Sequence, residues 1–198
     1  MRERPDINEC IAAHVRRLRT RQHLSLDALA NKSGVSRSMI SLVERAETSP
    51  TAVVLEKLAA GLGVTMASLF DPPAPVSNRP VARRADQPQW RDPDSGYLRR
   101  NVSPPGVPQP MQIAEVHFPP QKRVTFEAGG LDRRVHQQIW VLKGQINITL
   151  GTERHQLREG DCLALMQLGQ PMTFFNPGRK PAHYVVVVAP EIHSRRIS

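Results

Sequence analysis

Residues 25–45 read SLDALANKSGVSRSMISLVER, and this stretch predicts two short helices joined by a tight turn. Ser25 can cap the first helix, because its hydroxyl can accept an otherwise unpaired backbone N–H of the first turn. Gly34 suits the turn, since glycine tolerates a positive φ at no steric cost. Ser36 can cap the second helix in the same way as Ser25. Apolar residues recur at helical spacing and predict the inward faces of both helices: Leu26, Leu29, Ala30, Met39, Ile40 and Val43.

The outer side of the second helix carries short hydroxyls and two guanidiniums, with no carboxylate before Glu44. Such groups are common partners of phosphate oxygens, so this surface suits a polyanion. Its residues are Arg37, Ser38, Ser41, Leu42 and Arg45.

Caps, turn and apolar spacing agree along one register, and the stretch resembles the helix-turn-helix of phage-repressor-like regulators, the Xre family. The resemblance covers roughly residues 7–70. It implies a bundle of five helices that binds double-stranded DNA, with the helix after Ser36 in the major groove. By the same resemblance, Arg19 pairs with Glu44 and so orients that helix.

The other helices of the bundle are indicated by their own caps. Asp6 opens a helix that continues to about Arg21. Thr51 caps another helix, and Thr65 caps a final short turn that ends at Phe70. With the two helices described above, these segments bring the expected number to five.

The expected DNA contacts use the start of the second helix and its outer side. Arg37 lies at the helix N-terminus, where base edges are read, and can take guanine O6 and N7 in a bidentate fork. Ser38 and Ser41 can contact bases or phosphates, and by resemblance Leu42 is a base-reading position that can touch a thymine methyl group. The full set of expected DNA-binding residues is Ser25, Ser36, Arg37, Ser38, Ser41, Leu42 and Arg45.

Composition bounds the class of protein. Across 198 residues, 27 Lys and Arg against 18 Asp and Glu give a formal charge of +9, which favours a polyanionic partner. An apolar run of about 18 residues is missing, so we expect no membrane span. Residues 1–10 lack the apolar core of a signal peptide. Cys10 and Cys162 have no CxxC context, so we expect reduced thiols and a cytoplasmic protein.

Proline-rich sequence separates two regions of the chain. Consecutive prolines in residues 72–78 predict a stiff, extended linker. We therefore expect a helix-turn-helix domain over residues 6–71 and a second domain over residues 79–191. Residues 81–84 and 97–102 read as possible edge strands at the start of that second domain.

From Met111 onward, short β-type runs are separated by Gly, Asn and Asp turns, which predicts an antiparallel sandwich or barrel. The pattern IWVLKGQINITLG…HQLREGDCLALM…FFNPG, within residues 139–178, resembles both conserved blocks of the cupin barrel. The expected fold is therefore two-domain, α followed by all-β. A five-helix bundle precedes an antiparallel cupin β-barrel that serves as a sensor or dimerisation domain.

Metal-binding cupins, by this resemblance, use two paired histidines, a glutamate and a later histidine. Counting back from Gly144 places Gln137 at the glutamate position, and counting back from Asn176 places Met172 at the last histidine position. The paired positions fall within residues 130–133, which contain no histidine. Gln is a poor ligand for transition metals and Met suits only soft ions. We therefore expect no metal, no other cofactor and no enzymatic activity.

A barrel of this kind can still hold one small ligand at its mouth. Strand alternation gives the candidate lining, in which Arg123 has the clearest chemistry because a buried arginine needs an anionic partner. It indicates an acidic or amino-acid-like effector. The full candidate set is Arg123, Phe126, Gln137, Ile139, Met166, Met172, Phe174 and Tyr184.

Together these features predict a sequence-specific, DNA-binding transcriptional regulator. We expect a homodimer on a DNA operator, with two recognition helices about 34–36 Å apart, and a cupin domain that senses a small molecule, dimerises, or does both. Two alternatives stay open. One is a cupin enzyme, such as an isomerase or dioxygenase, tethered to a DNA-binding module. The other is an autoregulatory antitoxin-like or scaffold protein whose barrel only dimerises.

Overall fold

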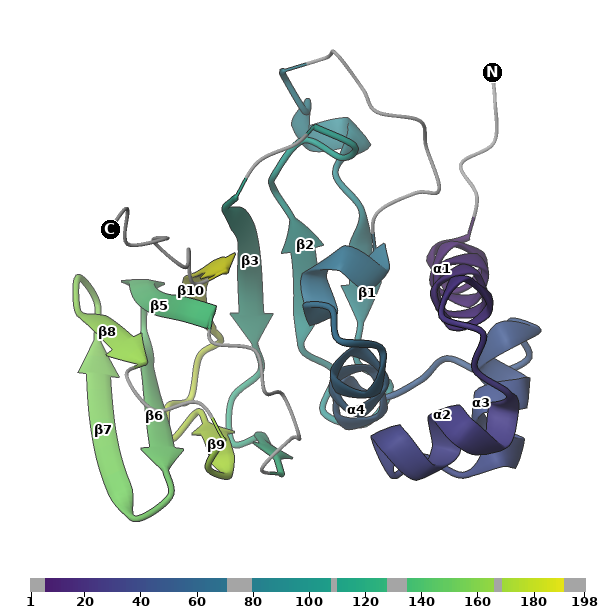
Figure 1. The fold of residues 1–198 in the computed structure, drawn as a ribbon. Coiled ribbons are helices and arrows are strands. Elements are labelled where there is room, and N and C mark those ends of the chain that lie inside the picture. The colour runs from purple at the N-terminus through teal and green to yellow at the C-terminus, as the bar shows by residue number, and fades with distance from the viewer. Residues whose placement is uncertain (1–5, 71–79, 108–109, 128–134, 166–168, 191–198) are drawn as a thin grey trace, which may run out of the picture.

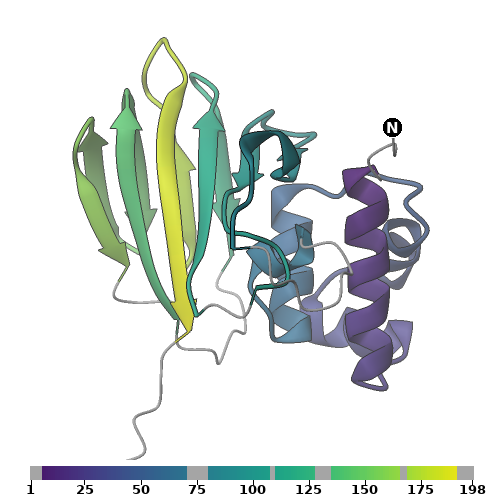
Figure 2. The ribbon, with the colours of Figure 1, turned by 90° about the horizontal axis from the view of Figure 1, so that it is seen from above.

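The computed structural model places a bundle of helices beside two β-sheets (Figures 1 and 2). Each helix within the described residues is too short or too polar to span a bilayer. The residues that the structure describes are 6–70, 80–107, 110–127, 135–165 and 169–190.

Four α-helices make up most of the first 70 residues. They are α1 Ile7–Arg21, α2 Leu26–Ser33, α3 Arg37–Glu44 and α4 Ala52–Leu62. The predicted caps are confirmed. The hydroxyl of Ser25 accepts a hydrogen bond from the N–H of Ala28 at 3.0 Å, and that of Ser36 accepts one from the N–H of Met39 at 3.2 Å. Gly34 adopts the left-handed conformation after α2, with φ 68°.

The prediction of a fifth α-helix is wrong. Residues Met66–Phe70 form a 3-10 helix, η1, of five residues. The hydroxyl of Thr65 caps it as predicted, accepting from the N–H of Ser68 at 3.2 Å. Tighter i→i+3 bonding is usual for helical segments this short, because they cannot complete several α-helical turns.

The helices pack through the apolar faces that the spacing predicts. Ile11, Leu29, Ile40 and Leu55 are fully buried. At their rim, the Arg19 guanidinium donates to both carboxylate oxygens of Glu44, at 2.7 and 2.8 Å, and to the Leu24 carbonyl at 2.9 Å. This fork raises the pKa of Arg19 and joins α1 to α3, so it fixes the direction of α3.

The rest of the described chain forms two antiparallel sheets. The six-stranded sheet has the order β1-β2-β3-β10-β5-β8 and the four-stranded sheet the order β4-β9-β6-β7. The first sheet contains β1 Gln89–Arg91, β2 Leu98–Asn101, β3 Gln112–Phe118, β10 Ala182–Pro190, β5 Val135–Lys143 and β8 Cys162–Leu165. The second contains β4 Arg123–Phe126, β9 Met172–Phe175, β6 Gln145–Leu150 and β7 Glu153–Arg158.

The closed barrel that the cupin resemblance implies is not what forms. Within the described residues the strands pair in two separate sheets, which face each other around a shared apolar core. The expected strand at residues 81–84 is also wrong, because Arg84–Asp86 forms a 3-10 turn, η2. Conversely, β7 was not predicted, since its mostly polar residues give only Leu157 to the core.

The helical half is bound to the sheets rather than tethered at a distance. Asp92, just after β1, accepts a hydrogen bond through Oδ1 from the N–H of Ala52 at 2.9 Å, which caps α4 from the other half of the chain. Figure 1 shows α4 beside β1 and β2. Two further hydrogen bonds join the halves: Asn101 Nδ2 donates to the Ala67 carbonyl at 2.9 Å, and the Thr65 hydroxyl donates to Gln112 Oε1 at 2.6 Å. The Phe70 and Trp90 rings also pack together, with their centroids 5.6 Å apart.

Replacing Asp92 by Ala tests this connection. Asp92 is only 2% exposed, and its other oxygen accepts from the N–H of Ser95 at 2.9 Å, so the change leaves buried donors unpaired. We expect a loss of about 1–3 kcal/mol in the free energy of unfolding, measured by chemical denaturation. Asp94→Ala removes an exposed carboxylate two residues away and is the matched control. Equal losses in the two variants would contradict the assigned role of Asp92.

Candidate nucleic-acid interface and interdomain cavity

The outer side of α3 is open to solvent. Ser36, Arg37, Ser38 and Arg45 are exposed, while Ser41 and Leu42 are half-buried at the base of the same surface. Ser25, at the start of α2, is exposed as well. The buried opposite face of α3, through Ile40 and Val43, holds the helix on the bundle. The residues predicted to contact DNA are therefore on the molecular surface around one helix.

Two ion pairs on this surface were not predicted from the sequence. Arg37 Nε lies 3.5 Å from Asp27 Oδ1, with both side chains about two-thirds exposed. The Arg45 guanidinium donates to both oxygens of Glu47, each at 2.7 Å, and also to the Ser41 hydroxyl. The paired charges raise the pKa of Arg45 and lower the pKa of Glu47. Because such exposed pairs contribute little, a phosphate group can replace either carboxylate at low cost.

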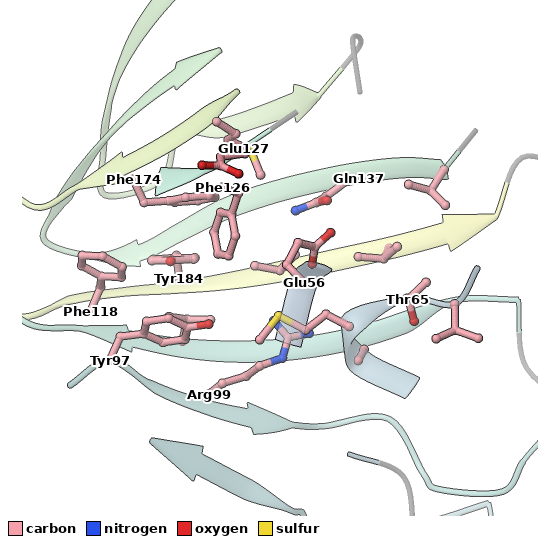
Figure 3. Close-up of a pocket in the computed structure, with 18 of the residues that line it drawn as sticks. Glu56, Thr65, Tyr97, Arg99, Phe118, Phe126, Glu127, Gln137, Phe174 and Tyr184 are labelled. Carbon is pink, nitrogen blue, oxygen red and sulfur yellow. The ribbon is translucent and has the colours of Figure 1, made fainter. Parts of the chain in front are cut away.

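A cavity of about 160 Å³ lies between the two sheets and the helical half. Its walls are mostly aromatic and aliphatic, and Figure 3 shows the side chains that surround it. Both halves of the chain contribute. Helix α4 supplies Glu56, and the segment that leads into η1 supplies Val64, Thr65, Met66 and Ala67. The other lining residues come from strands of both sheets and from segments beside them. The helical half thus covers a side that the two sheets leave open.

The predicted ligand-pocket residues are only partly brought together. Those that line the cavity are Phe126, Gln137, Met172, Phe174 and Tyr184. Ile139 is fully buried in the core and is not in the lining, and Met166 is outside the described residues. The expectation for Arg123 is wrong. Its side chain is exposed and its guanidinium lies over the Phe175 ring, 5.0 Å from the centroid, because that face of β4 points away from the core.

Sequence reasoning missed the charged residues that line the cavity, which are Glu56 of α4, Arg99 of β2 and Glu127 after β4 (Figure 3). Arg99 is 9% exposed, its Nε has no hydrogen-bond partner, and it makes no ion pair with a described carboxylate. Its guanidinium lies 5.8 Å from the Phe70 ring centroid. The alternation of β2 could have placed Arg99 on an inner face, but only the packing of α4 on the sheet brings Glu56 near it.

Burial shifts the pKa of both Arg99 and Glu56. It lowers the pKa of Arg99, against the opposing effect of the nearby Tyr97 and Glu56. It raises the pKa of the Glu56 carboxyl, and the positive charge of Arg99 offsets this only in part. The cavity lining therefore contains one cation, Arg99, and two carboxylates, of which Glu127 pairs with Lys57 at 2.6 Å. Arg99 and Glu56 are the two that form no ion pair with a described residue.

The cavity does not fit the metal that many cupins hold. Among the described residues, the lining contains no histidine or cysteine. Gln137 and Met172 line the cavity at two of the positions where metal-binding cupins would have a glutamate and a histidine. A separate group, Glu115 with His117 and His183, could offer three ligand atoms within 4.8 Å of one another. Strand alternation puts that group on the opposite face of β3 from Val116. Arg100 already pairs with Glu115. Burial chiefly, and the Arg100 charge in addition, lower the pKa of both imidazoles.

Comparisons with known proteins agree with the helix-turn-helix fold of the first part of the chain. Residues 15–69 match the family model described as HTH_3, helix-turn-helix. The chain therefore carries an Xre-like helix-turn-helix domain, followed by an all-β domain, and is a homologue of transcriptional regulators. It is similar to the HTH-type transcriptional regulator SutR of Escherichia coli (strain K12), with 27% identity over 153 residues, which is 76% of this chain and 79% of SutR.

Two solved structures are also similar to this chain, to different degrees. The crystal structure of an HTH_3 family transcriptional regulator from Vibrio cholerae is 26% identical, with a TM-score of 0.74, covering 94% of this chain and 98% of that one. The cupin_2 domain of an XRE family transcriptional regulator from Enterobacter cloacae is 11% identical, with a TM-score of 0.43, over 48% of this chain and 98% of that one.

Replacing Glu56 by Gln should stabilise the ligand-free protein at neutral pH. Because the pKa of this carboxyl is raised above its ordinary 4.5, the folded state keeps the proton to a higher pH than the unfolded state. The stability of the wild type relative to Glu56→Gln is then greatest below about pH 4.5, falls as the pH rises through the folded-state pKa, and levels off above it.

Chemical denaturation of both proteins between about pH 4 and pH 8 measures this difference, because groups common to both proteins cancel. A difference that rises with pH would mean instead that the folded protein stabilises the ionised carboxylate.

Proposed function

We propose that this protein is a sequence-specific DNA-binding transcriptional regulator that acts as a homodimer and responds to a small molecule in the interdomain cavity. In this proposal, residues 6–71 bind DNA, residues 72–78 link the two parts, and residues 79–191 form the sensor and dimerisation domain. The observation that carries the proposal is the solvent-exposed side of α3, which presents hydroxyls and guanidiniums while its apolar side is fixed in the bundle.

The contacts divide between base reading and positioning. Arg37, in the first turn of α3, reads guanine O6 and N7, and Leu42 touches a thymine methyl group. Ser36, Ser38 and Ser41 contact bases or phosphates. Arg45 releases Glu47 to pair with a phosphate, and Ser25 meets another phosphate at the N-terminus of α2. The fork between Arg19 and Glu44 holds α3 at a fixed angle for this purpose.

A dimer follows from the requirements of affinity. One short recognition helix covers few base pairs, whereas two helices on successive major grooves, about 34–36 Å apart, read a near-palindromic site. Sedimentation at equilibrium should therefore give twice the chain mass of 22.1 kDa.

An effector acts through the position of the cavity. Since α4 and η1 form part of the wall, a bound molecule touches the DNA-binding half and the sheets at once. It then favours whichever relative arrangement of the two halves it binds better, and so changes the fraction of dimers whose recognition helices match the operator. The absence of histidine from the described lining supports sensing rather than metal-dependent catalysis, and we place the protein in the cytoplasm with its DNA.

Sequencing the DNA recovered from a genomic pull-down of the full-length protein tests the function. Arg37→Ala should weaken binding to the recovered operator by about 1–3 kcal/mol and relax the preference at one base pair, measured by fluorescence anisotropy on a set of single-base variants. Arg154→Ala removes an equal, exposed charge from β7 and should leave affinity unchanged. An equal loss on every sequence would reassign Arg37 to the phosphate backbone, and recovery of no discrete site would overturn sequence-specific binding.

Salt dependence tests the phosphate contact of Arg45. Binding to the operator should weaken linearly in log affinity against log salt, because neutralised phosphates release counterions. Arg45→Ala should reduce the magnitude of that slope by about 1 and weaken binding to all sequences alike. An unchanged slope would show that Arg45 stays paired with Glu47 in the complex.

A further inference from the structure

The cavity contains an unsatisfied pair of opposite charges whose members come from different halves of the chain. Arg99 is more than nine-tenths buried and its Nε has no hydrogen-bond partner, although it lines the cavity. A buried guanidinium without an anion is costly, so the site is incomplete as it stands. A bound carboxylate would complete it, because a carboxylate accepts two parallel N–H bonds from arginine.

Because Glu56 also lines the cavity, a ligand with only a negative charge would not satisfy both side chains. The Glu56 side chain lines the same cavity from α4 and forms no ion pair among the described residues, whereas the other carboxylate of the lining, Glu127, pairs with Lys57 at 2.6 Å. A simple anion would satisfy Arg99 but be repelled by an ionised Glu56, and a simple amine would have the opposite difficulty. A molecule with a carboxylate and an ammonium group satisfies both side chains.

The remaining wall sets the size and the character of the rest of the ligand. The rest of the lining is largely apolar and includes Phe126 and Phe174 (Figure 3). Met66, Met172 and Val186 also belong to it. The volume of about 160 Å³ is close to that of engineered apolar cavities, about 150 Å³, that hold a molecule of benzene. The ligand is therefore small, with a short apolar side chain.

We infer that the interdomain cavity binds an aliphatic α-amino acid, with its carboxylate on Arg99, its ammonium group on Glu56 and its side chain against the aromatic wall. This inference rests on the proposed function, because it assigns the effector class of the same cavity. The ligand joins α4 of the DNA-binding domain to β2 of the sheet through its two charges. It thus links the two halves where direct pairing of Glu56 with Arg99 is missing.

Isothermal titration calorimetry on the full-length protein without DNA tests the inference. The probes are the L and D forms of valine, leucine and methionine, together with 4-methylpentanoate, which lacks the ammonium group of leucine, and 3-methylbutylamine, which lacks its carboxylate. We expect at least one amino acid to bind, and its analogues with a single charge to bind at least about tenfold more weakly.

Two variants test which side chain binds the carboxylate of the ligand and which binds its ammonium group. Arg99→Met should lower amino-acid affinity at least about tenfold and, because it removes an unpaired buried charge, should leave the protein folded. Glu56→Gln should weaken binding of the amino acid to a similar extent but should not weaken binding of 4-methylpentanoate. Glu159→Gln, which makes the same change at an exposed position after β7, is the control and should bind as the wild type does.

The outcomes separate this inference from the proposed function. If 4-methylpentanoate binds as tightly as leucine and Glu56→Gln has no effect, the site takes a simple carboxylate and the inference is wrong. If no probe binds while the protein still recovers a discrete operator, the inference fails and the DNA-binding function stands. Thermal unfolding of Arg99→Met with a single transition excludes misfolding as the cause of lost binding.

Discussion

The carboxylate of Asp92 holds the two halves of this protein together at the point where the structure most needs it. It accepts the N–H of Ala52 at the first turn of α4 and that of Ser95 in its own turn. A helix needs acceptors for its first N–H groups, and here Thr51 supplies one and a residue of the sheet half supplies another. The position of α4 on the sheets depends on this shared cap, and so do the polar contacts made by Thr65 and Ala67.

With α4 held in this position, the helical half covers the side of the cavity that the two sheets leave open. The two sheets leave a cavity whose apolar lining is unremarkable for a core, but α4 adds Glu56 opposite Arg99. Packing these groups lowers stability rather than raising it, because each loses water without gaining a full set of partners. Proteins tolerate such groups where a ligand completes the site. Their placement between the helix bundle and a β-sheet would give the proposed ligand a physical route to the DNA, since one bound molecule would contact both halves.

The sequence was most informative where a structure is decided by residues close together in the chain. The hydroxyls of Ser25 and Ser36 cap the predicted helices, and Gly34 takes the predicted left-handed turn. It was least informative about lining and closure. Arg123 was expected inside and lies outside, because the face of an edge strand such as β4 cannot be read from alternation until its neighbour β9 and the core are known. The short β7 was missed because one buried leucine gives no periodic pattern.

The sequence by itself therefore determined the helix-turn-helix unit, the polar outer side of α3, the antiparallel strands and the lack of cupin metal-ligand residue types at the matching positions. Those features depend on local hydrogen bonds, on periodicity and on residue identity. Only the tertiary structure decided that the sheets remain an open sandwich, that α4 covers the opening, and that Glu56 and Arg99 share one cavity. Their meeting depends on how two separately formed units pack together, and no pattern within either unit specifies that contact.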